Sequence, residues 1–130
     1  MRYSKQREIV MHQVERRHDH PTAEEVYRNA VSECPSLSLG TVYRNLNSLV
    51  EAGLVRRVSI PGQADRFDHT LQWHGHLYCT ACGSVADLDM DYAPLEQLVK
   101  GQPGKVTDCV LTMMGLCESC AAKQAEAAAQ

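Results

Sequence analysis

The stretch His74-Gly75-His76-Leu77-Tyr78-Cys79-Thr80-Ala81-Cys82 carries two metal-binding patterns side by side. His74 and His76 are two positions apart, so on a strand both rings leave the same face. Cys79 and Cys82 have the spacing at which one tight turn presents two sulfurs to a single ion. This stretch therefore predicts a metal-binding domain in the second half of the chain.

A second cysteine pair, Cys117 and Cys120, repeats the CxxC spacing further along. Four thiolates make a closed tetrahedral site that holds zinc without an open position, which predicts a structural zinc. The alternatives are two labile disulfides or a redox motif of the thioredoxin type. Cys34 and Cys109 are left over, and we expect both to be buried free thiols.

Length and composition favour one or two small globular domains. The chain has 130 residues, of which 44% are hydrophobic and 22% charged, an ordinary globular balance. It shows no signal peptide and no apolar run of membrane-spanning length, so we expect a soluble cytoplasmic protein without a membrane partner. In a reducing compartment, six cysteines indicate metal or redox chemistry before structural disulfides.

Charge is unevenly distributed between the two halves. Residues 1–66 have ten Lys/Arg and eight Asp/Glu, a net +2, whereas residues 67–130 have three and eight, a net −5. The division fits a mildly basic nucleic-acid reader joined to an acidic metal domain. Chance scatter of surface charge is an equally good explanation of the charge alone.

Three helices are predicted in the first half. The first runs from a Ser4 cap to about His18, with Ile9, Val10, Val14 and Gln13 inward. Thr22 caps a second helix over residues 23–33, and Ser38 opens a third over 39–51. In the third helix, the core positions are Val42, Leu46, Leu49 and Val50.

The opposite face of the third helix has no acidic residue. Its members are Thr41, Tyr43, Arg44, Asn45, Asn47 and Ser48. Such a face approaches phosphates without repulsion, and Arg44 can donate to a guanine edge. We therefore predict a DNA-contacting helix, the alternative being a small helical domain with a solvated polar face.

A hairpin follows the third helix. Residues 54–60 alternate as a strand, Pro61-Gly62 makes a turn, and residues 66–68 return. Three helices and a two-stranded hairpin are typical of a winged helix-turn-helix. The hairpin arginines Arg56, Arg57 and Arg66 are expected beside the DNA backbone.

The second half predicts a small α+β domain. We expect strands at 76–78, 84–89 and 106–114 and helices at 93–100 and 118–129, with Leu95, Leu98 and Val99 facing inward. So small a sheet does not easily bury both faces, and pairing with a second copy would cover it. The predicted architecture is thus α+β, with a DNA-binding domain at 1–68 and a homodimerising metal domain at 69–130.

A second metal site can be assembled around the His-x-His pair. Its candidate ligands are His20, Asp68, His74, His76 and Asp87. Imidazole and carboxylate donors suit Fe(II), Mn(II) or Zn(II). Such a site would join the two domains, so that metal sets the angle of the DNA-binding unit. Each residue taken alone is better explained as a solvated or core side chain, and only the His-x-His pair makes a metal site an equally good explanation.

Motifs along nearly the whole chain resemble the ferric uptake regulator family, and within it the peroxide-sensing branch. They are His20–Tyr27, Thr41–Leu46, Gly53–Val55, Arg66–Asp68, His74–His76, Cys79–Gly83 and Gly115–Cys120. The resemblance implies a homodimer on a palindromic operator, with Tyr43 and Arg44 in the major groove.

The resemblance also implies a structural zinc on the four cysteines and a regulatory Fe(II) or Mn(II) on the five His/Asp residues. In that branch peroxide reacts at the iron site, a ligand histidine becomes 2-oxo-histidine and repression ends. His20 and His74 match the histidines oxidised there.

The chain departs from the family pattern at two places, and two other functions are possible. Trp73, Gly75 and Cys109 stand where many iron-sensing members have further ligands, and the leading helix looks short. A regulator that senses only the level of iron or zinc is the main alternative. A metalloenzyme would need an open position and a placed base, and no residue near the His-x-His pair recommends itself, so we expect no enzymatic activity.

Overall fold

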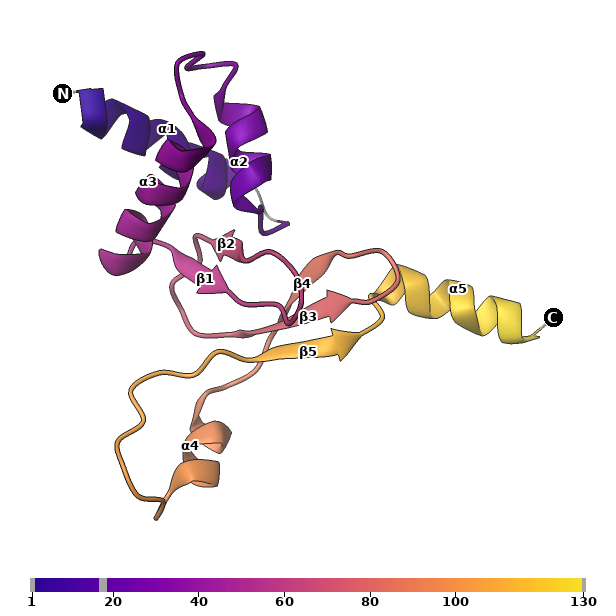
Figure 1. Cartoon of the computed structure of the whole chain (residues 1–130). Helices are drawn as coiled ribbons and strands as arrows, with labels where there is room; N and C mark the ends of the chain where they lie inside the picture. The colour runs from indigo at the N-terminus through magenta and orange to yellow at the C-terminus, as the bar shows by residue number, and fades with distance from the viewer. Residues whose placement is uncertain (1, 17–18, 130) are drawn as a thin grey trace. The chain divides into compact units, whose positions relative to one another are not determined.

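The computed structural model describes residues 2–16 and 19–129 and divides into two compact units, residues 1–71 and 72–130 (Figure 1). Each unit is described by itself. Within the described residues, no helix has both the length and the apolar character needed to cross a membrane.

Unit 1 consists of three helices and a two-stranded hairpin. They are α1 (Arg2–Arg16), α2 (Ala23–Ala30), α3 (Leu39–Glu51), β1 (Arg56–Val58) and β2 (Arg66–Asp68). β1 and β2 pair antiparallel, with Arg57 opposite Phe67. This order of elements is a winged helix-turn-helix, in which the β1–β2 hairpin is the wing.

The core of unit 1 joins the apolar faces of its helices to one face of the wing. Its members include Val10, Val14, Val26, Val42, Leu46, Leu49, Val55 and Phe67. On α3 the positions recur at i, i+4 and i+7, the spacing that keeps side chains on one face of a helix. The opposite face of α3 is therefore left for solvent or a partner.

The helix boundaries of unit 1 follow the predicted caps in two cases. Thr22 caps α2 by accepting from the Glu25 backbone N–H, and Ser38 caps α3 in the same way for Thr41, which confirms both predictions. The predicted Ser4 cap is wrong, because α1 already includes Arg2. His18, its expected end, lies outside the described residues.

Two predicted elements of unit 1 are longer than the observed ones. α2 ends at Ala30 instead of residue 33, because the N–H groups of Glu33 and Cys34 both bond to the Ala30 carbonyl and close a turn. The strand predicted for residues 54–60 is regular only over Arg56–Val58. Burial alternates from Arg57 to Ile60, but the partner strand is only three residues long.

Unit 2 contains a three-stranded sheet and two helices. The elements are β3 (Gly75–Cys79), β4 (Val85–Leu88), α4 (Ala93–Val99), β5 (Thr112–Gly115) and α5 (Glu118–Ala129). The strand order is β4-β3-β5, with β3 antiparallel to β4 and parallel to β5. The central strand β3 follows His74 and ends on Cys79.

Two expectations for unit 2 are wrong. The strand predicted at 106–114 forms only over Thr112–Gly115. The predicted inward face of α4 is largely exposed, with Leu98 at 75% and Val99 at 40% exposed. Apolar spacing indicates that a face seeks burial but not what buries it, and α4 has no buried residue in this chain.

Candidate metal and DNA-binding sites

Four cysteine sulfurs converge in unit 2. The Sγ atoms of Cys79, Cys82, Cys117 and Cys120 all lie within 4.8 Å of one another. Corners of a tetrahedral zinc site with bonds of about 2.3 Å are separated by about 3.8 Å. The Cys82 and Cys117 sulfurs are 3.9 Å apart, so the cluster has the size of a zinc tetrathiolate and is too open for a disulfide between this pair.

Two similar turns present these sulfurs. The Cys82 backbone N–H points to Cys79 Sγ at 3.5 Å, and the Cys120 N–H points to Cys117 Sγ at 3.4 Å. Gly83 closes the first turn with φ 78°, a conformation that favours glycine. The turns are brought together because β3, which ends on Cys79, pairs with β5, which ends just before Cys117.

The ionisation of the cysteines differs within the cluster. Backbone N–H groups, chiefly that of Cys117, lower the pKa of Cys79 from 9.0 to about 6. The Ser84 hydroxyl lowers the pKa of Cys82. Hydrogen bonds to the sulfurs of Cys117 and Cys79 favour the protonated thiol of Cys120 and raise its pKa to about 12. A bound cation would let all four become thiolates, and this donor set fits zinc.

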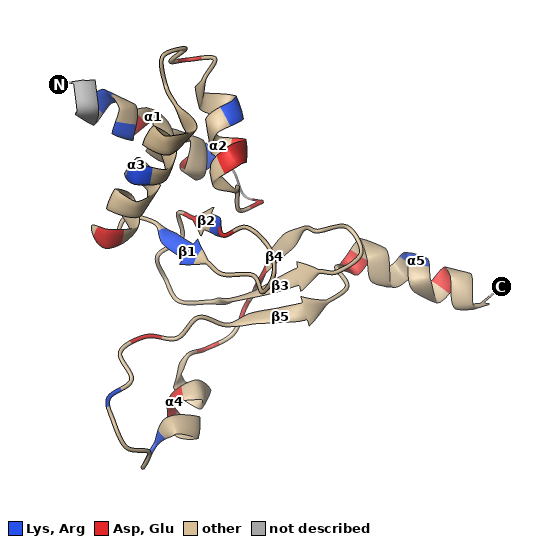
Figure 2. Ribbon diagram, in the orientation of Figure 1, with Lys and Arg blue, Asp and Glu red and all other residues tan. Residues whose placement is uncertain are grey.

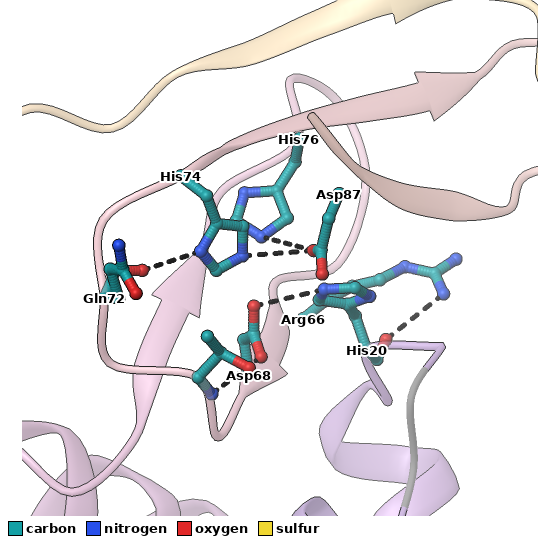
Figure 3. Close-up of polar contacts among 8 residues, drawn as sticks. His20, Arg66, Asp68, Gln72, His74, His76 and Asp87 are labelled. Atoms are coloured by element: carbon teal, nitrogen blue, oxygen red, sulfur yellow. Dashed lines mark hydrogen bonds and ion pairs between the residues drawn. The ribbon is translucent and has the colours of Figure 1, made fainter. Parts of the chain in front are cut away.

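Three nitrogen and oxygen donors meet elsewhere in unit 2 (Figure 3). His74 Nε2 lies 3.1 Å and His76 Nε2 3.6 Å from Asp87 Oδ1, and the two ring centroids are 4.5 Å apart. His76 stands opposite Asp87 in the β3–β4 pairing. The strand register therefore brings this carboxylate to the His-x-His pair.

The Gln72 carbonyl determines how His74 presents its ring. His74 Nδ1 lies 2.8 Å from Gln72 O, and a carbonyl can only accept, so Nδ1 carries the proton. In the neutral ring, the lone pair is then on Nε2, the atom that faces Asp87. No pattern in the sequence points to this role for Gln72, because any residue supplies a backbone carbonyl.

Unit 1 by itself contains a buried His–Asp pair. His20 Nε2 lies 3.1 Å from Asp68 Oδ2, and both side chains are buried. Two ligands on adjacent octahedral corners, each about 2.1 Å from an ion, lie about 3.0 Å apart. This pair and the His74–Asp87 pair both have that separation, so each donor set fits a borderline-hard divalent ion.

The recognition face of α3 differs from the prediction at one residue. Tyr43 and Arg44 are exposed, and Thr41 is half-buried. Asn45 is fully buried and donates from Nδ2 to the Thr41 carbonyl, so its predicted contact with DNA is wrong for this conformation. Asn45 lies one helical turn before Leu49, on the core side of α3.

Basic residues in unit 1 lie on α3 and β1, among other elements (Figure 2). Arg44 folds back along its own helix, where Nη2 donates to the Thr41 hydroxyl at 2.9 Å. Arg56 is half-buried and Arg57 is exposed. Arg57 contacts Asn47 on α3 as well as Asp65 before β2.

Comparison with known proteins agrees with this arrangement. The model of the ferric uptake regulator family matches residues 1–114. The peroxide operon regulator of Bacillus subtilis is 31% identical over 126 residues, covering 95% of this chain and 87% of the relative. The peroxide-responsive repressor PerR of Staphylococcus epidermidis is 30% identical over 125 residues, covering 92% and 81%.

Among solved structures, the Campylobacter jejuni peroxide stress regulator is similar with a TM-score of 0.77 and 34% identity, covering 92% of this chain and 91% of that one. The fold, the cysteine cluster and the sequence matches lead to one conclusion: this chain is a member of the ferric uptake regulator family.

Proposed function

We propose that this protein is a metal-dependent transcriptional repressor that binds DNA and responds to hydrogen peroxide. Two relatives of about 30% identity are named as peroxide regulators, which supports the peroxide branch of the family. The winged helix-turn-helix of unit 1 supports DNA binding, and the donor sets support metal dependence.

DNA binding is proposed for the exposed face of α3. Tyr43 and Arg44 would enter the major groove, with Thr41 at the edge of the same face and Arg56 on the wing. A homodimer would present two such helices and read a palindromic operator. The exposed apolar residues of unit 2 support pairing with a second copy: Leu98, Val106, Val110, Met113 and Met114.

We assign a structural zinc to the four cysteines and a regulatory Fe(II) or Mn(II) to His20, Asp68, His74, His76 and Asp87. Only five residues separate Asp68 from His74. A connection that short keeps the donors of the two units at high effective concentration for one ion. An ion shared in this way would fix the DNA-binding unit relative to the dimerising one.

One observation carries the proposal: two of the five donors, His20 and Asp68, belong to the unit that carries the recognition helix. A metal that needed only unit 2 would have no direct means of orienting α3. Because His20 follows α1 and Asp68 ends the wing, ligation would act directly on the DNA-binding unit.

The peroxide response is proposed to destroy a ligand. Iron(II) held by these donors would supply the redox chemistry that activates hydrogen peroxide. One peroxide oxygen would be inserted at the ring carbon between the two nitrogens of His20 or His74, giving 2-oxo-histidine, and the other would leave as water. The oxidised ring would be a poorer metal donor. With one donor lost, the two units are no longer held in the DNA-binding arrangement.

The test is mass spectrometry of Fe(II)-loaded protein before and after one equivalent of hydrogen peroxide, with DNA binding followed in parallel. A gain of about 16 Da on the peptide that holds His20 or His74, together with loss of DNA binding, is expected. Mn(II)-loaded protein is the matched control, in which neither change is expected.

The alternative is a regulator that senses metal level, which the description of the family itself favours. In that case peroxide adds no mass to either peptide, and DNA binding simply follows reversible exchange of metal. Turnover of a substrate by the loaded protein would instead contradict the proposal that this chain is a regulator and not an enzyme.

A further inference from the structure

We propose that Arg57 is a positioning residue that holds the wing against the recognition helix, instead of a phosphate contact as its charge suggests. This inference rests on the proposed DNA binding of unit 1. It concerns how the wing and α3 are fixed relative to one another within that unit.

The Arg57 guanidinium has three partners from three different segments. Nη2 donates to Asn47 Oδ1 on α3. Nε pairs with Asp65 Oδ2 at 3.6 Å, in the loop before β2. The guanidinium carbon lies 5.9 Å from the centroid of the Phe67 ring on β2, within the range of a cation–π contact. We call this arrangement the Arg57 bridge.

A positioning role for Arg57 would compensate for the low stability of the wing as an isolated hairpin. β1 and β2 are three residues each, and a two-stranded hairpin is marginally stable by itself. Phe67 packs into the core of unit 1, and Val58 is also buried. The Arg57 bridge adds a polar link from the wing to the middle of α3, the helix that must be aligned with the groove.

Arg44 differs from Arg57 in the contacts that it would lose on turning toward DNA. Its guanidinium donates to Thr41 one turn earlier on the same helix, so swinging it toward DNA leaves the tertiary structure unchanged. Moving Arg57 to a phosphate would abandon Asn47, Asp65 and the Phe67 ring together. Asp65 beside it also offsets the charge that a phosphate would meet.

Lysine cannot replace arginine in such a bridge. A planar guanidinium donates in two directions while stacking on a ring, whereas an ammonium is a point charge. For a phosphate contact the two residues are nearly equivalent, because charge dominates. Arg57→Lys therefore distinguishes the two roles. Asp65→Ala does so as well, because the two roles predict opposite changes in DNA affinity. Removing a carboxylate strengthens the electrostatic attraction to DNA, whereas loss of the Arg57 bridge weakens binding.

The experiment uses full-length, metal-loaded protein and a duplex selected by the wild type from a random-sequence pool. Affinity is measured from low to moderate salt for the wild type, Arg57→Lys, Asp65→Ala and Arg57→Gln. Arg28→Gln is the control for loss of one charge, since Arg28 lies exposed on α2. Thermal unfolding and zinc content confirm that each variant is folded.

We expect Arg57→Lys and Asp65→Ala each to weaken binding about tenfold, as for residues coupled in one network, with the wild-type salt dependence retained. The inference is overturned if the Arg57→Lys variant binds DNA with wild-type affinity. It is also overturned if the Asp65→Ala variant binds DNA as tightly as the wild type or more tightly. A decrease of about one in the salt slope for Arg57→Gln, the mark of a lost phosphate contact, likewise overturns it. If the wild type enriches no duplex, the proposed DNA binding itself fails, which is a different result.

Discussion

The backbone N–H of Phe67 donates to the carbonyl oxygen of Pro21 at 2.9 Å. This bond ties the turn that carries His20 to the strand that carries Asp68. His20 has φ 61°, the one positive φ among the non-glycine residues described, a conformation that persists only where its surroundings hold it. The His–Asp pair of unit 1 is thus held in place by contacts within unit 1.

Asp68→Asn tests whether this pair contributes to the regulatory site. The amide keeps the volume and the acceptor for the Thr70 N–H, but it removes the charge that attracts a divalent ion. We expect Mn(II) affinity to fall by about tenfold to a hundredfold with little change in thermal unfolding. Isothermal titration measures the affinity, and Glu24→Gln on α2 controls for the lost charge. Equal affinity in both variants would exclude Asp68 as a ligand.

Separate substitutions distinguish the two metals. His74→Ala is expected to abolish metal-dependent DNA binding and leave zinc content and thermal unfolding unchanged, because the cysteine cluster does not include it. Cys79→Ser is expected to release zinc and destabilise unit 2, because Cys79 is buried. Zinc analysis and circular dichroism of both variants check this, and unfolding of the His74 variant would show that the roles are reversed.

Asn45→Leu tests the correction on α3. Asn45 Oδ1 is buried without a hydrogen-bond partner among the described residues, and such an atom costs about 1–3 kcal/mol. Leucine has a similar volume, so we expect the free energy of unfolding to rise by about 1 kcal/mol. Urea denaturation measures it. A large loss of DNA affinity in a stable variant would return Asn45 to the DNA contacts.

In the metal-free, reduced protein, Cys79 and Cys120 together should contribute most to stability near pH 9. The folded pKa of Cys79 is lowered from 9.0 to about 6. Its contribution is therefore complete above pH 9.0 and disappears as pH falls through about 6. The folded pKa of Cys120 is raised from 9.0 to about 12, so its contribution is complete below pH 9.0 and disappears as pH rises toward 12.

Chemical denaturation of the metal-free protein across pH 5 to 12 (about the span of these two pKa values) measures this profile. Cys79→Ser should lose the rise between about pH 6 and 9 and keep the decline above it. A wild-type profile that is flat from pH 6 to 9 would contradict the lowered pKa of Cys79.

Local signals in the sequence were sufficient for most of the elements. The caps at Thr22 and Ser38, the apolar spacing of α3 and the turn residues of the wing act within a few residues of chain, so each could be predicted from its neighbours. The strand expected at 106–114 failed because strand formation depends on a partner, and β3 offers β5 only four residues of pairing.

Residue type and spacing alone establish which chemistry the chain carries: CxxC pairs, a His-x-His pair and a helix face without acidic residues. Tertiary structure decided which donors meet and which side chains are available. It turned Asn45 into the core, placed Asp87 opposite His76 by strand register, and engaged Arg57 between α3 and the wing. These outcomes depend on contacts between residues distant in the chain, which local patterns do not contain.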